Sequence, residues 1–530
     1  MNRAVGKIPF FNGCLEKYLN SPNHSNLSPA MMDLLQYLWL FIYLSALMAL
    51  FTYGMNCWFL MLVYRLNYPQ AVKNHQKIKD AFYQNVPAGD WPRVTIQLPI
   101  YNERYVVKRL IKAVCMIDYP GDLLEVQVLD DSTDDTLEIA RATIEEMKAQ
   151  GVDIVHVRRD NRSGFKAGAL REGLKTSKGE LIAIFDADFI PNRDFLKESV
   201  PYFKNPQIGM LQIRWGHINS DYSLLTRAQS IGIDGHFGVE QAARAWSGFF
   251  MNFNGTAGVW RKKTIQEAGG WQADTLTEDL DLSYRAQLKG WKLMFAPQVV
   301  CPAEVPVTIN AFKSQQHRWA KGSIQTAKKN LGKLFKSDLS LLVKIQAFLH
   351  LTHYMVHPMM LLVVLTSIPM LYTQWFFDNL AYPIMIFTLL CLATFGPSSL
   401  YLFSQRILYR DWKSRIKYLP LLMCLGTGIA VNNTKAILEA LFGIKSGFIR
   451  TPKYGIQNKG ESWKSKRYAI PLNSISILEF LLGLYSLTGL FMFLFFSKYL
   501  VSPFLLIYTC GFFYVFFLSV KHGYGKPPSK

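Results

Sequence analysis

The chain has 530 residues, half of them hydrophobic, and carries a formal net charge of +20 at pH 7. One hydrophobic core rarely supports that length, so the composition predicts a membrane part beside a soluble domain. The charge is typical of basic cytoplasmic loops in membrane proteins, and the lack of a basic helix or an aromatic–basic RNA motif argues against a nucleic-acid partner. The seven Cys residues are widely spaced without a Cys-x-x-Cys pair, which indicates free thiols and argues against a zinc site or a disulfide framework.

The first predicted element is a long apolar run over residues 34–66, which follows a tail of residues 1–33. The run is long enough to cross the roughly 30 Å hydrocarbon core of a bilayer with turns to spare. It is too long, and starts too far from the amino terminus, for a cleaved signal peptide. We therefore expect one tilted transmembrane helix with the tail on the extracytoplasmic side.

Residues 67–305 are expected to form a soluble domain, because from residue 91 short β-rich runs alternate with helical stretches. This alternation predicts a mostly parallel sheet with helices on both faces, and such sheets bind ligands beyond the carboxyl ends of their strands. Polar motifs follow several of these strands directly. The predicted elements are the strands Val94–Leu98, Val126–Leu129 and Leu181–Phe185, and helices over Val106–Ile117 and from Asp134.

Two acidic motifs follow neighbouring predicted strands. Asp186 and Asp188 stand one residue apart, so they can present oxygen ligands to a Mg²⁺ or Mn²⁺ ion that bridges a diphosphate. Asp130 and Asp131 end the strand before. Each motif has a structural alternative, because Asp is common in solvated turns and helix caps. Their position at adjacent strand ends favours a binding role for the two motifs together.

A third acidic motif, Thr277-Glu278-Asp279, precedes a helical stretch. In a structural interpretation, Thr277 caps this helix and the two acids interact with its dipole. In the functional interpretation, Asp279 is a general base that takes the proton of an attacking hydroxyl, a role worth roughly 10² to 10⁴ in rate. The motif alone leaves both interpretations open.

Residues 306–343 are predicted to form amphipathic helices at the membrane surface, and they carry Gln315, Arg318 and Trp319. Arg is a common headgroup contact and Trp a common interface residue, so one alternative is purely structural. The other is an Arg that binds a leaving diphosphate and a Trp face on which a sugar ring stacks.

Two more segments have open interpretations. Lys166 would either add positive charge to the same diphosphate or lie on the surface. The turn over Phe253–Gly258 contains glycines that allow the backbone to approach a ligand closely, or it is merely a tight turn.

Four further spans are predicted, two within residues 344–404 and two within 473–521. The link after the first pair is rich in Arg and Lys, whereas the links inside the pairs carry only Lys498 as a basic residue. Basic links face the cytoplasm, so the soluble domain and the basic tail, residues 522–530, are expected there too. Within residues 405–472, an apolar run with polar residues inside it and basic flanks predicts an interfacial or re-entrant segment.

The order and spacing of the motifs resemble those of processive, membrane-embedded family-two glycosyltransferases. Within them, the resemblance is to cellulose synthases and the cellulose-synthase-like A and C groups, which make β-linked mannan or glucan. It covers residues 91 to about 330 and implies an α/β GT-A (Rossmann-like) cytosolic glycosyltransferase domain plus an α-helical transmembrane region. The segments that carry it are Gln97–Glu103, Val128–Thr133, Lys166–Leu170, Phe185–Phe189, Phe253–Gly258, Thr277–Asp279 and Gln315–Trp319.

Carried over by position, the resemblance implies a role for each site residue. Asp279 would be the catalytic base, and Arg318 would stabilise the departing diphosphate. The other catalytic positions are Glu278, Gln315 and Trp319. The donor-binding residues are Tyr101, Glu103, Asp130, Asp131, Lys166 and Asp186, and the metal ligands for Mg²⁺ or Mn²⁺ are Asp186 and Asp188. The acceptor-binding residues are Phe253, Asn254, Gly255, Thr256 and Trp319. A loop that closes over the nucleotide in cellulose synthases corresponds to Phe448, Arg450, Thr451 and Lys453, with Arg450 where Val is usual.

The resemblance implies an inverting, processive polysaccharide synthase that adds hexose from GDP-mannose or UDP-glucose to the non-reducing end of a β-linked glycan and moves the product across the membrane. Its partners are the nucleotide-sugar donor, the growing glycan and the lipid bilayer, with export or accessory subunits left open. The membrane is a bacterial inner membrane, or the Golgi membrane in a eukaryote.

Two functions other than a polymer synthase are compatible with parts of this pattern. A single-transfer glycosyltransferase that acts on a membrane lipid, such as ceramide or polyprenyl phosphate, needs the metal and the base but no polymer channel. The complete Gln-x-x-Arg-Trp segment and the number of spans favour the processive enzyme. A catalytically inactive membrane scaffold is disfavoured because every expected acid is present.

Overall fold

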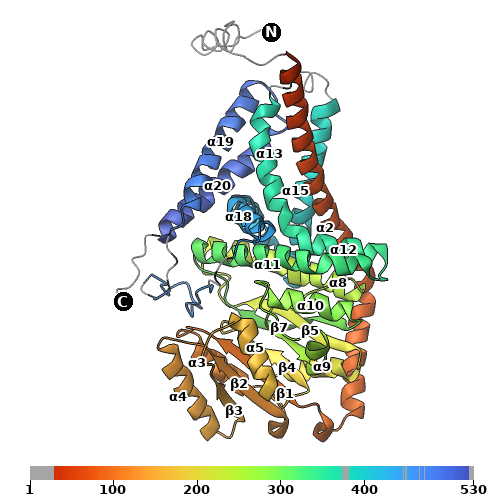
Figure 1. The fold of residues 1–530 in the computed structure, drawn as a ribbon, viewed down its shortest axis with the longest axis vertical. Helices are drawn as coiled ribbons and strands as arrows, with labels where there is room; N and C mark the ends of the chain where they lie inside the picture. Colours follow the sequence, from red (N-terminus) through yellow and green to blue (C-terminus); the bar gives the residue numbers. More distant parts are fainter. Residues whose placement is uncertain are drawn as a thin grey trace.

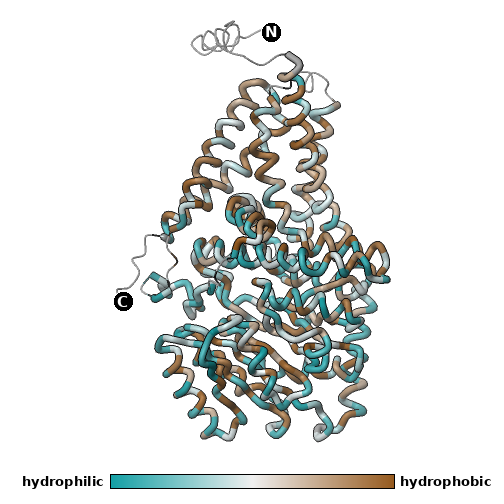
Figure 2. The backbone as a smooth tube through the Cα atoms, in the orientation of Figure 1, coloured by the Kyte–Doolittle hydropathy of each residue, from teal (hydrophilic) through white to brown (hydrophobic). Residues whose placement is uncertain are grey.

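The structure, a computed structural model, describes residues 29–371, 373, 381–445, 447, 450–464, 466–468, 470 and 472–523. An α/β domain lies below a bundle of long helices, and helix α2 (Pro29–Asn85) runs alongside both (Figure 1). Hydrophobic residues dominate the bundle, whereas polar residues are frequent over the α/β domain (Figure 2). This division agrees with a membrane part beside a soluble domain.

A seven-stranded sheet forms the centre of the α/β domain, in the order β3-β2-β1-β4-β6-β5-β7. Strand β1 pairs in parallel with β2 and β4, β2 with β3, and β5 with β7, whereas β6 is antiparallel to both of its neighbours. The prediction of a mostly parallel sheet is therefore confirmed, with β6 as the exception. The strands are β1 (Val94–Ile100), β2 (Leu124–Asp130), β3 (Ile154–Val157), β4 (Leu181–Ile184), β5 (Ile208–His217), β6 (Gly258–Arg261) and β7 (Lys292–Ala303).

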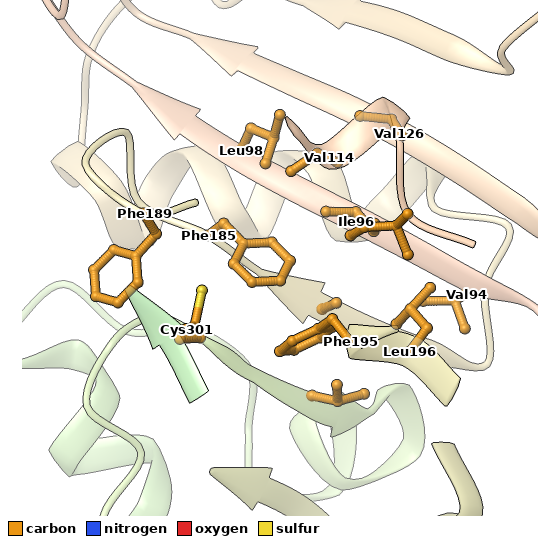
Figure 3. Close-up of a cluster of buried hydrophobic side chains, with 14 of the residues drawn as sticks. Val94, Ile96, Leu98, Val114, Val126, Phe185, Phe189, Phe195, Leu196 and Cys301 are labelled. Carbon is orange, nitrogen blue, oxygen red and sulfur yellow. The ribbon is translucent and has the colours of Figure 1, made fainter. Parts of the chain in front are cut away.

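The central strands form because both of their faces are covered. Nearly every residue of β1 and β2 is buried, as expected for parallel strands packed between helices. Figure 3 shows part of this core, where the Phe185 ring at the end of β4 meets the Phe195 ring edge-on with centroids 4.7 Å apart. The core fixes the carboxyl ends of β1, β2 and β4 relative to one another.

Helices cover the sheet and connect its strands. They are α3 (Val107–Cys115), α4 (Thr136–Ala149), α5 (Phe165–Thr176), α6 (Phe195–Ser199), α7 (Leu224–Gly235), the π-helical turn η4 (His236–Glu240), α8 (Gln241–Trp246), α9 (Lys262–Glu267) and α10 (Glu278–Leu288). Short 3₁₀ turns are η1 (Ala88–Asp90), η2 (Gly121–Leu123) and η3 (Val200–Lys204).

Two helices, α11 (Ile309–Lys336) and α12 (Leu341–Thr352), lie across the base of the bundle between it and the sheet (Figure 1). The elements that follow are η5 (His353–Met355), α13 (Val356–Met370), α15 (Ala381–Leu408), α16 (Trp412–Arg415), η6 (Ile416–Tyr418), α17 (Leu419–Gly428), α18 (Ala430–Leu441), α19 (Ile475–Phe495) and α20 (Ser502–Gly523).

Among the described residues, five helical segments are long and apolar enough to cross a membrane, in agreement with the predicted spans. They are Asp33–Asn85, Leu341–Met370, Ala381–Leu408, Ile475–Phe495 and Ser502–Gly523. The segments Trp412–Gly428 and Ala430–Leu441 are bent by 41° and together make either a broken sixth span or a re-entrant loop, so this stretch stays open.

The first helix is longer than its predicted membrane span. Helix α2 continues past residue 66 to Asn85, because its distal half packs on the α/β domain. There Lys79 Nζ lies 2.5 Å from Glu198 Oε1, and Phe82 joins the main core. Residues 1–28 of the predicted extracytoplasmic tail and 524–530 of the predicted basic tail lie outside the described residues, whereas residues 29–33 begin α2 and residues 522–523 end α20.

Candidate active site

A pocket opens at the carboxyl ends of β1, β2 and β4 and is bordered by α10 and α11. It brings together most of the site residues that the sequence predicts, from motifs more than 300 residues apart. Those that line it are Tyr101, Glu103, Asp131, Lys166, Asp186, Asp188, Asn254, Gly255, Glu278, Asp279, Gln315, Arg318, Trp319, Arg450, Thr451 and Lys453.

Three predicted residues lie behind the pocket and do not line it. Asp130 is 1% exposed, accepts a hydrogen bond from the Ser132 amide at 2.8 Å and contacts His156, so it shapes the turn that presents Asp131. Phe253 is fully buried, and Thr256 Oγ1 accepts a hydrogen bond from the Asp186 amide at 2.8 Å. The fourth exception, Phe448, lies outside the described residues.

The two helices that border the pocket approach each other through a glycine. A Cβ atom on Gly322 of α11 would lie 2.5 Å from Thr277 Oγ1, so only a glycine lets α11 cross the turn before α10 this closely. Thr277 makes no side-chain capping hydrogen bond to α10, so the capping interpretation of Thr277 is wrong. The close crossing brings Arg318 of α11 to the same pocket as Asp279 of α10.

The Asp279 carboxylate faces the turn over Phe253–Gly258. A Cβ atom on Gly255 would lie 2.9 Å from Asp279 Oδ2, and Gly255 has a φ of +84°, so glycine is favoured both by space and by backbone conformation. Asp279 Oδ1 accepts a hydrogen bond from the Leu280 amide at 2.8 Å. The other oxygen is thereby directed toward the turn.

Charges of both signs are concentrated in this buried site. Burial raises the pKa of Asp279 well above its usual range, the neighbouring Glu278 raises it further, and Lys166 opposes the rise. Burial likewise raises the pKa of Glu278. Burial opposes the charge of Lys166, but Asp186 and Glu278 outweigh it and raise the pKa of Lys166. Burial lowers the pKa of Arg318, although Glu278 and Asp186 favour its charge. The site thus holds a base of increased proton affinity next to cations suited to a polyanion.

Asp186 and Asp188 fit a divalent cation. Each carboxylate is paired with a lysine, Asp186 with Lys166 and Asp188 with Lys453. Asp188 Oδ1 is buried and has no hydrogen-bond partner among the described residues. No group of three or more His, Cys, Asp or Glu side chains in the described part of the chain is arranged to hold a metal. The protein would therefore supply two hard oxygen donors, and a Mg²⁺-type ion would complete its shell with diphosphate and water oxygens.

The loop that carries Arg450 and Lys453 reaches into the pocket beside Glu103 and Asp188. Arg450 Nη1 lies 2.7 Å from Glu103 Oε2, and the guanidinium lies 4.4 Å from the centre of the Tyr468 ring. Burial raises the pKa of Glu103 to about 7, although Arg450 and Lys453 lower it. The Gly455 amide also donates to Glu304 Oε2 at 3.1 Å. The loop therefore packs against the pocket through ion pairs of Arg450 and Lys453 with acidic residues and through the Gly455 hydrogen bond.

Sequence reasoning missed Arg162, which lines the pocket and whose guanidinium lies 3.3 Å from the centre of the Tyr101 ring. It also missed Arg159, whose Nε donates to Asp131 Oδ1 at 2.9 Å. A signal was present, because the stretch just before Lys166 holds three arginines. Their roles depend on which acidic or aromatic side chain each one meets, and that is set by tertiary structure.

Comparison with known families gives one match over the α/β domain. A family model described as glycosyltransferase like family 2 matches residues 92–322. Glucomannan 4-beta-mannosyltransferase 2 of Arabidopsis thaliana is 45% identical over 244 residues, which is 45% of this chain and 46% of that protein. Glucomannan 4-beta-mannosyltransferase 1 of Oryza sativa subsp. japonica is 45% identical over 252 residues, 47% of this chain and 48% of that protein. The chain spans about half the length of the curated relatives it matches.

Two solved structures are also similar. The mannosyltransferase PcManGT of Pyrobaculum calidifontis, in complex with GDP-Man and Mn²⁺, aligns over 75% of this chain and all of its own, with 20% identity and a TM-score of 0.44. S. aureus TarS aligns over 67% of this chain and 56% of its own, with 14% identity and a TM-score of 0.37.

Proposed function

We propose that this chain, whose residues 92–322 match the model described as glycosyltransferase like family 2, is a membrane-embedded β-mannan synthase that transfers mannose from GDP-mannose to the non-reducing end of a β-1,4-linked glycan. The observation that carries the proposal is the meeting of Asp279, Arg318 and the Asp186/Asp188 pair in one pocket beneath the membrane helices. Mannose is favoured because the matched segment is 45% identical to glucomannan 4-beta-mannosyltransferases.

Asp279 is the base in this mechanism. It takes the proton of an acceptor hydroxyl as that oxygen attacks the anomeric carbon, while the bond to the diphosphate breaks and the configuration inverts from α to β. A divalent ion held by Asp186 and Asp188 would neutralise charge on the diphosphate when bound. Arg318 and Lys166 provide fixed positive charge where the leaving group becomes more negative.

The acceptor end is assigned to Trp319, Asn254 and Gly255, which line the pocket. An indole face suits the apolar face of a sugar ring, and an amide suits its hydroxyl groups. Behind them, Gln241 Nε2 donates to Asn254 Oδ1 at 2.6 Å and fixes the orientation of that amide. A held acceptor and a fixed base together reduce the entropic cost of reaction.

Coupled export of the glycan is the second part of the proposal. Polar side chains continue from the pocket toward the bundle: Asn254 Nδ2 lies 3.1 Å from His236 Nε2, and His236 Nδ1 lies 3.1 Å from Glu240 Oε2. Both of these side chains in the π-helical turn η4 are partly exposed, at 28% and 33%. Further on, the rings of His353 and Tyr354 lie 4.1 Å apart. Polar side chains at this junction of the α/β domain and the bundle can exchange hydrogen bonds with sugar hydroxyls, which supports passage of the glycan here.

The loop residues Arg450, Thr451 and Lys453 are assigned to donor closure. In the structure, Lys453 pairs with Asp188 and Arg450 with Glu103. A bound diphosphate competes for these cations because it carries more negative charge than either carboxylate. The loop would then exchange acid contacts for phosphate contacts and cover the donor.

The test is sugar incorporation by the purified full-length protein in liposomes. Labelled GDP-mannose and UDP-glucose would each be supplied with Mg²⁺ or Mn²⁺, and the product released with detergent and digested with an endo-β-1,4-mannanase. We expect long, mannanase-sensitive product from GDP-mannose, and none from the Asp279→Asn variant. Product from UDP-glucose alone would overturn the sugar assignment, and a short product extractable into organic solvent would overturn the polymer assignment in favour of a lipid acceptor.

A further inference from the structure

Helix α11, which carries the Gln-x-x-Arg-Trp segment, is held to three other elements by ion pairs at eight-residue intervals. In each pair, a lysine of α11 meets a carboxylate that belongs to a different helix. The pairs are Lys313–Glu479 of α19 (2.6 Å), Lys321–Glu439 of α18 (2.8 Å) and Lys329–Asp281 of α10 (2.9 Å). These contacts tie α11 to the α/β domain at one end and to the bundle at the other.

The Lys313–Glu479 pair is the most enclosed of the three, with side chains 5% and 0% exposed. Lys313 is also approached by hydroxyl groups of two spans, at 3.5 Å from Ser476 Oγ and 3.4 Å from Ser519 Oγ. On its backbone side, Asn432 of α18 donates to the Lys313 carbonyl at 2.9 Å. Polar groups of α18, α19 and α20 therefore converge on this one residue of α11.

Such a pair specifies geometry better than an apolar contact does. A buried charge is costly unless a partner of opposite charge stays at hydrogen-bond distance, so the pair tolerates little rotation or sliding of α11. Lys313 stands two residues before Gln315 and five before Arg318. At 1.5 Å per residue, a rigid helix transmits any shift at Lys313 directly to the Arg318 side chain.

We propose that Glu479, a residue of span α19, is a positioning residue of the transferase site, which through Lys313 sets the rotation and axial position of α11 and keeps Arg318 and Trp319 directed into the pocket. The expected effect of Glu479 on mannose transfer rests on the proposed function, whereas its expected effect on the placement of α11 does not. The donor residues at the strand ends are held by the sheet and do not depend on Glu479.

The test uses Glu479→Gln in the full-length protein, with amide hydrogen exchange as a readout independent of activity. We expect exchange over residues 313–320 to rise about tenfold or more, because the local opening free energy falls. Exchange in β1 and over 329–336, which Asp281 holds, stays as in the wild type. The matched control is Glu198→Gln, which breaks the ion pair with Lys79 that joins α2 to the α/β domain and should leave α11 unchanged.

Mannose transfer provides the second readout. For Glu479→Gln we expect kcat per folded molecule to fall about tenfold while the KM for GDP-mannose stays within about twofold, because only transition-state contacts are lost. Lys313→Met should behave alike, and the double variant Lys313→Met/Glu479→Gln should be no worse than either single change, since the two residues act as a unit.

Three results would overturn the inference: unchanged exchange over 313–320 in Glu479→Gln, exchange raised equally throughout the chain, or single effects that multiply in the double variant. If the wild-type protein transfers no mannose, the proposed function is wrong. Amide hydrogen exchange over residues 313–320 would still decide whether Glu479 positions α11.

Discussion

In the proposed mechanism, the reactivity of the site depends on one carboxylate, Asp279, and on the residues that change its proton affinity. Burial raises its pKa, the adjacent Glu278 raises it further, and Lys166 acts in the opposite direction. A general base acts only when deprotonated, so activity is lost as the pH falls through this raised pKa. We therefore expect the acid limb of kcat/KM well above about 3.9, the ordinary value for Asp.

Glu278→Gln should shift that acid limb. The substitution removes a negative neighbour, so the pKa of Asp279 falls and the limb moves to lower pH by about one unit. The measurement is the initial rate of mannose transfer across the acid range. Glu267→Gln, on the exposed side of α9, serves as the control and should leave the limb in place. A limb that does not move in Glu278→Gln would show that Asp279 is not the group that titrates.

Thr256 orients the proposed metal ligands. Its hydroxyl accepts a hydrogen bond from the Asp186 amide and so fixes the turn that carries Asp186 and Asp188. Thr256→Val leaves that amide without its partner, a loss of about 1 kcal/mol. We expect the Mn²⁺ concentration for half-maximal activity to rise about fivefold, in line with that energy. Thr275→Val is the matched control, because the Thr275 hydroxyl is buried without a hydrogen-bond partner in the described residues. If the Mn²⁺ concentration for half-maximal activity changed equally in Thr256→Val and Thr275→Val, the role of Thr256 in orienting Asp186 would be contradicted.

At the scale of elements, local patterns predicted the strands and the acids at their ends, because burial and chain order determine both. Alternation of β-rich and helical runs was enough to place Asp131 and Asp186 at one edge of the sheet. Patterns did not predict that α2 would continue to Asn85, since its distal half is stabilised by Glu198, which lies far along the chain. The Lys313–Glu479 pair escaped prediction for the same reason: each residue alone is only a charge near an apolar run.

The crossing of α2 and α15 gives a prediction at this scale. A Cβ atom on Gly396 of α15 would lie 2.2 Å from the Gly54 carbonyl oxygen of α2, so the two backbones touch. Gly396→Ala must push the helices apart at a cost of about 1–3 kcal/mol, despite the better helix propensity of Ala. We expect a thermal midpoint in detergent lower by several degrees. In Gly426→Ala, where an added Cβ meets nothing within 4 Å, the midpoint should stay or rise. An unchanged thermal midpoint in Gly396→Ala would show that the backbones of α2 and α15 are not in close contact at this crossing.

At the scale of the whole molecule, the pocket lies between a sheet that holds the donor residues and a bundle that could receive the product. Helix α11 forms the boundary, and its ion pairs reach α10 on one side and α18 and α19 on the other. In the proposed function, turnover and export would both depend on this one helix, and the growing glycan would leave the site past Trp319 and the polar side chains of η4.

This arrangement predicts where the polymer accumulates. In proteoliposomes whose catalytic domain faces outward, mannan made from external GDP-mannose should enter the lumen and resist added mannanase until detergent is supplied. Molecules that face inward receive no donor and do not contribute. His236→Ala, which breaks the hydrogen bond from Asn254 at the start of the path, should shorten the protected product more than it slows donor cleavage, because the growing chain loses a contact beyond the reacting sugar. Product that stays sensitive to mannanase outside the vesicles would contradict coupled export, while leaving the transfer chemistry at Asp279 intact.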